Sequence, residues 1–130
     1  MYHFSTRLEG EMESIELQVV EALKQEGFGV LTEIDVQATL KEKLGVDGRP
    51  YRILGACNPS LAHKALTAEA EIGLLLPCNV VVREEENGSI TVAFMDPLTV
   101  LGITGREDLA PLGADAKARL ERVRDGVLAG

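Results

Sequence analysis

The chain has 130 residues, of which 45% are hydrophobic and 26% charged, the composition of an ordinary soluble globular protein. This length favours a single domain, 1–130, large enough to bury roughly two-thirds of its unfolded surface. The formal charge of −8, from 21 acidic and 13 basic residues, repels phosphate groups, so we expect neither nucleic-acid nor membrane-surface binding.

Location follows from what the sequence lacks. No apolar run approaches the roughly 20 residues that a membrane-spanning helix needs. The first residues, Met1 to Arg7, do not show the basic-then-apolar pattern of a secretory signal. A cytoplasmic location is therefore the default prediction.

Hydrophobic periodicity divides the chain into strands and helices. Apolar residues recur every three or four positions where we expect a helix and every second position where we expect a strand. Glycine and capping residues separate most of these segments. In chain order, we predict a strand at 2–8, a helix at 11–26, a strand at 28–34, a helix at 36–44, a strand at 51–57, a helix at 59–69, strands at 78–85 and 90–95, a helical turn from Asp96 to Leu101, and a helix at 106–128 with breaks favoured at Pro111 and Gly113.

The pairing of these strands is less directly encoded. Asn87-Gly88 predicts a two-residue hairpin turn, because this pair accepts positive φ at both positions, and the two strands it joins must be antiparallel. Helices between the first four strands suggest partly parallel pairing elsewhere. We therefore predict a two-layer α+β fold with a mixed five-stranded sheet, in the order β-α-β-α-β-α-β-β-α, and helices packed mainly on one face.

One stretch of the chain stands out as a candidate functional site. The predicted strand at 51–57 ends at Cys57 and passes at once into a helix, with Asn58 as the N-cap and Pro59 at the first helical position. A cysteine beside a helix N-terminus is placed where the helix dipole favours the thiolate. A second Cys-Asn pair, Cys78 and Asn79, leads the next strand. These five residues are the candidate ligand-binding residues.

Each candidate also has a purely structural interpretation. Cys57 could pack beneath the helix that follows it, and Cys78 could be a small hydrophobic residue at the start of an apolar strand. Asn58 and Asn79 could serve only in capping and turn hydrogen bonds. The two cysteines can lie near each other only if their strands run antiparallel, because one cysteine ends its strand and the other begins its own.

Metal and cofactor chemistry find little support. The two histidines, His3 and His63, have no recognised ligand spacing with the cysteines, so we expect no metal site. Nucleotide-binding glycine loops, zinc-protease motifs and nucleophile elbows are all missing, so we expect no cofactor.

Four stretches resemble the uncharacterised bacterial and archaeal family catalogued as domain of unknown function 302. They are Gly27 to Asp35, Tyr51 to Pro59, Gly73 to Asn79 and Met95 to Pro97. The strand-Cys-Asn-Pro turn is the most specific of them. The resemblance implies a small α+β fold, a homodimer, and no established activity.

Three functions of different classes remain open. The first is a domain that binds a small ligand at the strand-Cys57-Asn58-Pro59-helix turn. The second is a homodimeric structural or interaction module without chemistry. The third is a thiol-dependent redox enzyme that uses Cys57 and Cys78. Whether there is any catalysis is not decided by the sequence.

Overall fold

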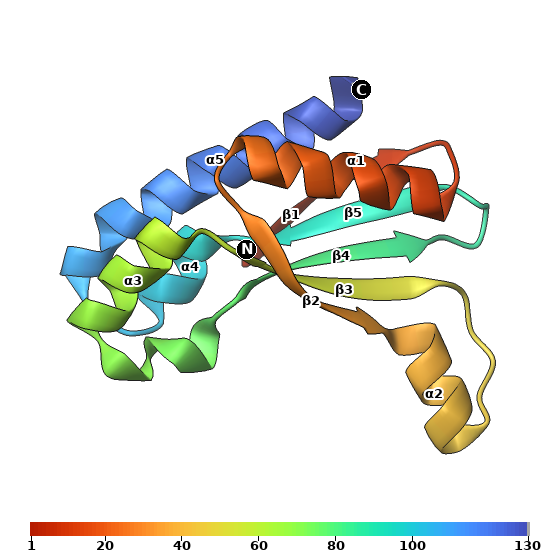
Figure 1. Cartoon of the computed structure of the whole chain (residues 1–130), viewed down its shortest axis with the longest axis horizontal. Coiled ribbons are helices and arrows are strands. Elements are labelled where there is room, and N and C mark those ends of the chain that lie inside the picture. The colour runs from red at the N-terminus through yellow and green to blue at the C-terminus, as the bar shows by residue number, and fades with distance from the viewer. Residues whose placement is uncertain (130) are drawn as a thin grey trace.

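The computed structural model describes residues 1–129, and a five-stranded sheet forms its centre (Figure 1). The strands lie in the order β1-β5-β4-β3-β2, and all four neighbouring pairs are antiparallel. Their bounds are β1 His3–Leu8, β2 Gly29–Asp35, β3 Tyr51–Cys57, β4 Cys78–Glu84 and β5 Ile90–Met95.

Within residues 1–129 there are five α-helices and two short 3-10 helices. They are α1 Met12–Gln25, α2 Val36–Leu44, α3 Pro59–Ala68, η1 Ala70–Leu75, α4 Pro97–Gly102, η2 Glu107–Leu109 and α5 Ala110–Ala129. Of these, α1, α2, α3 and η1 connect strands, and α4, η2 and α5 follow β5. The predicted elements are therefore present, with two differences. First, η1 was not predicted. Second, the last predicted helix is divided into the 3-10 turn η2 and the helix α5. Pro111 lies in the first turn of α5, where a missing N–H is tolerated.

The α+β class is confirmed, but the expectation of partly parallel pairing is wrong. The β1-α1-β2 unit does bring two strands into the same direction, yet β1 and β2 lie at opposite edges of the sheet. α2 does not cross the sheet at all, so β2 and β3 pair as antiparallel neighbours. The prediction failed because a helix between two strands fixes a parallel pair only when the helix packs back across the sheet between them.

The main core lies between one face of the sheet and the pair α1 and α5, which run side by side across it (Figure 1). The helical spacing of apolar residues places Val19 and Leu23 of α1 on this face, and both are fully buried. Phe94, near the end of β5, is fully buried in the same core. The other residues of this core include Ile15, Leu54, Val80, Val82, Val92, Leu120, Val123 and Val127.

The predicted hairpin between β4 and β5 is confirmed, with a different turn. No residue other than glycine has positive φ among residues 1–129, so Asn87 does not adopt the conformation that an Asn-Gly two-residue turn requires. Gly88 has φ of 87°, and its N–H donates to the Glu85 carbonyl at 3.0 Å. The connection is therefore a three-residue loop with glycine in the left-handed position.

The other face of the sheet carries much less cover. α2 projects from that side, at the end of β2, and buries none of its residues (Figure 1). It is still a well-formed helix, because Asp35 Oδ1 accepts from the Ala38 N–H at 2.9 Å and Gly45 ends it in the left-handed conformation. Within residues 1–129, none of the helices has the length and apolar character needed to cross a bilayer.

Candidate functional site: an apolar cavity beside Cys57 and Cys78

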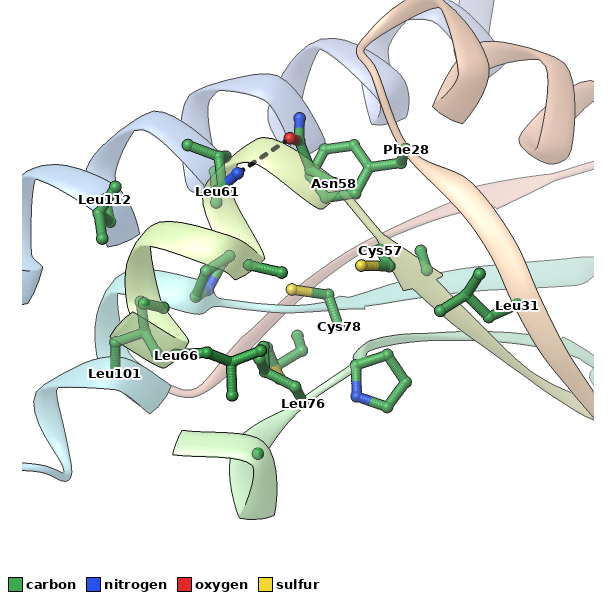
Figure 2. A pocket seen from close by; sticks show the side chains of 18 residues that line it. Phe28, Leu31, Cys57, Asn58, Leu61, Leu66, Leu76, Cys78, Leu101 and Leu112 are labelled. Atoms are coloured by element: carbon green, nitrogen blue, oxygen red, sulfur yellow. Dashed lines mark hydrogen bonds between the residues drawn. The ribbon is translucent and has the colours of Figure 1, made fainter. Parts of the chain in front are cut away.

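A cavity of about 300 Å³ lies where the ends of β3 and β4 meet α3. Its lining comes from segments far apart in the sequence: β2, the two strand ends, α3, η1, α4 and α5 (Figure 2). Most of the wall is hydrocarbon, supplied by Phe28, Leu31, Leu61, Leu66, Leu76, Leu101, Leu112 and several alanines. The sheet end and the helices therefore enclose a hollow that is apolar on nearly all sides.

The start of α3 sets the position of the cavity wall. Asn58 is the N-cap, as predicted, and its Oδ1 accepts a hydrogen bond from the Leu61 N–H at 3.2 Å. Pro59 occupies the first helical position, where its missing N–H costs nothing. The strand therefore ends at Cys57 and the helix begins within two residues of it, which brings the α3 side chains Leu61 and Ala65 over the cavity.

Asn58 also joins three helices. Its Nδ2 donates to the Glu26 carbonyl at 3.4 Å, and Arg119 Nη1 of α5 donates to the same oxygen at 3.0 Å. The end of α1 is thus tied to α3 and α5. Gly27 is needed here, because its φ is 84° and a Cβ would lie 3.0 Å from Asn58 Nδ2. Because Oδ1 and Nδ2 both have hydrogen-bond partners within the protein, the role that the structure gives to Asn58 is to stabilise the fold.

The strands that carry Cys57 and Cys78 are antiparallel, which is the condition for the two cysteines to lie near each other. In this pairing of β3 with β4, Ala56 is opposite Cys78, so Cys57 lies one position beyond the residue that faces Cys78. Both are free thiols, and both line the cavity. Figure 2 shows their sulfur atoms directed to the same side, into the hollow in front of α3. Burial, with a smaller contribution from the neighbouring Cys57, raises the pKa of Cys78 to about 11, so Cys78 is a protonated thiol at neutral pH.

The remaining two candidates lie outside the cavity. Pro59 is exposed on the outer side of the α3 start. Asn79 follows Cys78 but points to the opposite face of the sheet, where it borders a second hollow, of about 380 Å³, with Tyr51 and Val81. This follows from the two-residue period of a strand, which sends successive side chains to opposite faces. Of the five predicted residues, the structure therefore brings Cys57, Asn58 and Cys78 together.

Sequence reasoning missed the contact that closes the floor of the site. Gly55 is buried in the middle of β3, and a Cβ there would lie 2.8 Å from Pro77 Cγ and closer still to Thr32 Oγ1 of β2. Pro77 packs against this gap and lines the cavity. The available signal was a glycine inside an otherwise apolar strand, which marks a close approach of another segment.

An ion pair between a buried Asp96 and a partly exposed Lys117 holds α4 against the cavity. Asp96 caps α4, accepting from the Leu98 and Thr99 N–H groups at 3.0 and 3.3 Å, while Lys117 Nζ of α5 lies 2.9 Å from Asp96 Oδ2. Burial opposes ionisation of Asp96, but the hydrogen bonds from Lys117 and Thr99 outweigh it and lower the pKa of Asp96 below its usual value. Leu101 of α4 is thereby fixed in the cavity wall.

These features define a small two-layer α+β domain with an apolar cavity at one end of an antiparallel sheet. Residues 4–127 match the profile of the domain of unknown function DUF302. A crystal structure of an uncharacterized conserved DUF302 protein from Bacillus stearothermophilus shares 34% sequence identity, with a TM-score of 0.90 over 98% of each chain. The chain belongs to the DUF302 family. A comparison with curated proteins gave no match.

Proposed function

We propose that this domain binds a small, largely apolar ligand in the cavity beside Cys57 and Cys78. The observation that carries the proposal is the cavity itself, about 300 Å³ with a predominantly hydrocarbon lining. That volume lies at the lower end of the range for small-molecule sites, roughly 300–1,000 Å³, and an apolar cavity of roughly 150 Å³ already suffices for benzene.

The hollow is larger than ordinary packing leaves. Protein interiors are close-packed, and a void loses the dispersion contacts that its lining atoms would otherwise make. A ligand of matching size would restore those contacts. Leu31 and Leu66 of the lining are 68% and 43% exposed, which gives such a ligand a route from solvent.

Binding of a neutral fluorescent probe tests the proposal. N-phenyl-1-naphthylamine brightens on entering apolar surroundings and carries no charge that could be attracted elsewhere. We expect saturable binding to the wild-type chain. Ala62→Leu places extra carbon atoms into the cavity lining and should weaken binding by about tenfold or more, equivalent to ~1.4 kcal/mol.

The matched control is His63→Leu, which adds an apolar side chain of the same size at the next, exposed position of α3. It should bind the probe as the wild type does. Equal binding by wild type and Ala62→Leu, with both folded by circular dichroism, would show that the probe sits elsewhere and would refute the cavity as the ligand site.

The thiol-dependent redox enzyme has weaker support. The raised pKa of Cys78 keeps its sulfur protonated, and a thiol is a poor nucleophile compared with a thiolate. A cytoplasmic location, which we also propose, would keep both cysteines reduced. The rate of Cys57 alkylation by iodoacetamide against pH decides the matter: a midpoint well below about 8.5 would favour the enzyme.

A second candidate function is a homodimeric interaction module. What supports it is the sheet face that α1 and α5 leave bare: Tyr51, Ile53 and Val81 are half-buried there, and Tyr51 and Val81 border a hollow on it. The neighbouring α2 leaves Leu40 and Leu44 42% and 70% exposed. Apolar side chains on an uncovered sheet face and helix are typical of surfaces that meet a partner, and a second copy would meet the same face of the first.

Light scattering after size exclusion tests the dimer. We expect the mass of two chains for the wild type and of one chain for Val81→Glu, which places a charge in the middle of the bare face. Leu17→Glu is the matched control, because Leu17 is 70% exposed on α1, on the helix-covered side of the sheet. A wild-type mass of one chain would refute this candidate.

A further inference from the structure

We infer that the same cavity is a site for a soft d10 metal ion, with Cu(I) as the ion its donors select. Three sulfur-containing side chains, Cys57, Cys78 and Met95, line one hollow at the end of three adjacent strands. The inference goes beyond the proposed ligand function, because it depends on the sulfur atoms and not on the volume around them.

The donor set is soft and has little competition from oxygen or nitrogen. Thiolate and thioether sulfur prefer Cu(I), whereas carboxylates and carbonyls suit magnesium and calcium. In the cavity lining, the only polar side-chain atoms besides the thiols belong to Asn58, and both already have partners within the protein. Nowhere within residues 1–129 do three or more His, Cys, Asp or Glu side chains gather as metal ligands, so the proposed site depends on two thiols and a thioether.

The arrangement of the strands brings the sulfurs to one place. Cys57 ends β3 and Cys78 begins β4, one residue away from facing each other directly. β5 is the next strand beyond β4, and Met95 ends it level with Asn79, where it borders both the cavity and the hollow on the other face of the sheet. Neither cysteine side chain donates to or accepts from another described residue, so both thiols are free to turn towards an ion. Figure 2 shows both cysteine sulfurs directed into the hollow.

The chemistry is a proton-for-metal exchange. One Cu(I) ion binds two thiols and displaces two protons, which gives a bis-thiolate of net charge −1 with no change in oxidation state. The N-terminus of α3, directly after Cys57, carries partial positive charge that offsets this anion. Because binding releases protons, affinity for the ion should increase with pH.

An anaerobic titration with Cu(I) against the chelator bathocuproine disulfonate tests the inference. We expect one ion per chain, release of two protons and an ultraviolet thiolate-to-copper charge-transfer band. Cys57→Ser and Cys78→Ser should each remove the band and weaken binding by more than the roughly 100-fold that loss of an outer-shell partner causes. Zn(II), which favours four ligands, should bind far more weakly.

Two methionines provide the matched comparison. Met95→Leu should lower Cu(I) affinity about tenfold by removing the thioether, while Met12→Leu, which changes a buried methionine at the start of α1, should leave affinity unchanged. Circular dichroism and naphthylamine binding show whether each variant keeps the fold and the cavity.

The possible results separate this inference from the proposed function. Naphthylamine binding without Cu(I) binding would overturn the metal site and leave the ligand proposal standing. Cu(I) binding without naphthylamine binding would support the metal site and refute the apolar ligand. Equal Cu(I) affinity in the wild type and both cysteine variants would overturn the metal site outright.

Discussion

The two ends of the hydrophobic interior are built differently. Beneath α1 and α5, side chains such as Val19, Leu23 and Phe94 are fully buried and fill the space against the sheet. Beneath α3, a smaller cluster containing Ala65, Ile72 and Leu101 borders a cavity of about 300 Å³. The end beneath α1 and α5 is closely packed, whereas the end beneath α3 contains the cavity. The variants below are ways to test that contrast, from the largest expected effect to the smallest.

The sharpest contrast is between two truncations. Phe94→Ala should lower the free energy of unfolding by about 3–5 kcal/mol, because a fully buried ring is replaced by a cavity in close-packed surroundings. Leu112→Ala removes a half-buried side chain from a wall that already borders empty space, so the expected loss is about 1–2 kcal/mol. Urea unfolding of both variants measures the difference. Equal losses would mean that the cavity end is packed as tightly as the main core.

The second test concerns Gly55, which leaves room for neighbouring side chains to approach β3 closely beside the cavity. Gly55→Ala would put a Cβ 2.8 Å from Pro77 Cγ and closer still to Thr32 Oγ1, so Thr32 of β2 and the Pro77 loop must both move, at a cost of about 1–3 kcal/mol in the free energy of unfolding. Gly29→Ala, on edge strand β2, meets nothing within 4 Å and should change stability by less than about 0.5 kcal/mol. Thermal unfolding of the pair measures this, and a tolerated Gly55→Ala would show that Pro77 does not close the cavity floor.

Local signals explain which parts of this architecture the sequence predicts. The start of α3 is encoded within a few residues, because Asn58 caps the helix and Pro59 fits its first position. Strand pairing depends on where helices pack, which no local pattern records. α2, for example, has the apolar stripe of a packed helix yet buries nothing.

The candidate site divides in the same way. Cys57 and Asn58 were found because their spacing to a helix start is local, whereas the cavity needs Leu101 and Leu112 from elements more than 40 positions further along the chain. Asn79 was included through its adjacency to Cys78, and the alternation of β4 sends it to the other face. A repeated dipeptide in sequence is therefore not a shared site when one copy lies within a strand.

The third test removes the charge that holds α4 at the cavity end. Asp96 is 5% exposed and its pKa is lowered, so the ionised form stabilises the fold. Asp96→Asn keeps a capping side chain but loses the ion pair with Lys117, and we expect a loss of about 1 kcal/mol at pH 7. The sign of the pH dependence follows from the direction of the pKa shift. The difference should be complete above the ordinary Asp pKa of about 3.9 and vanish as pH falls through the lower folded-state value. A difference that persists at pH 2 would mean that shape, and not charge, is what Asp96 contributes.

The last and smallest effect lies at the rim of the packed end, where Arg52 of β3 holds α1 through Glu13 at 2.6 Å and Glu16 at 3.4 Å. Burial first, and then the neighbouring Glu33 carboxyl, raises the pKa of Glu16. A raised pKa means that Glu16 favours folding when protonated, below its ordinary pKa of about 4.3, and that this contribution is lost as pH rises through the folded-state value. Glu16→Gln imitates the protonated form. The variant should therefore match the stability of the wild type near pH 4, and its free energy of unfolding should exceed that of the wild type by a few tenths of a kcal/mol at pH 7.

Glu13→Gln is the control, because the pKa of Glu13 is lowered by its hydrogen bond with Arg52 and its substitution should destabilise the fold in the same pH range. Urea unfolding of both variants at the two pH values gives the comparison, and destabilisation by Glu16→Gln at pH 7 would show that the Arg52 ion pair outweighs the cost of burying the Glu16 charge.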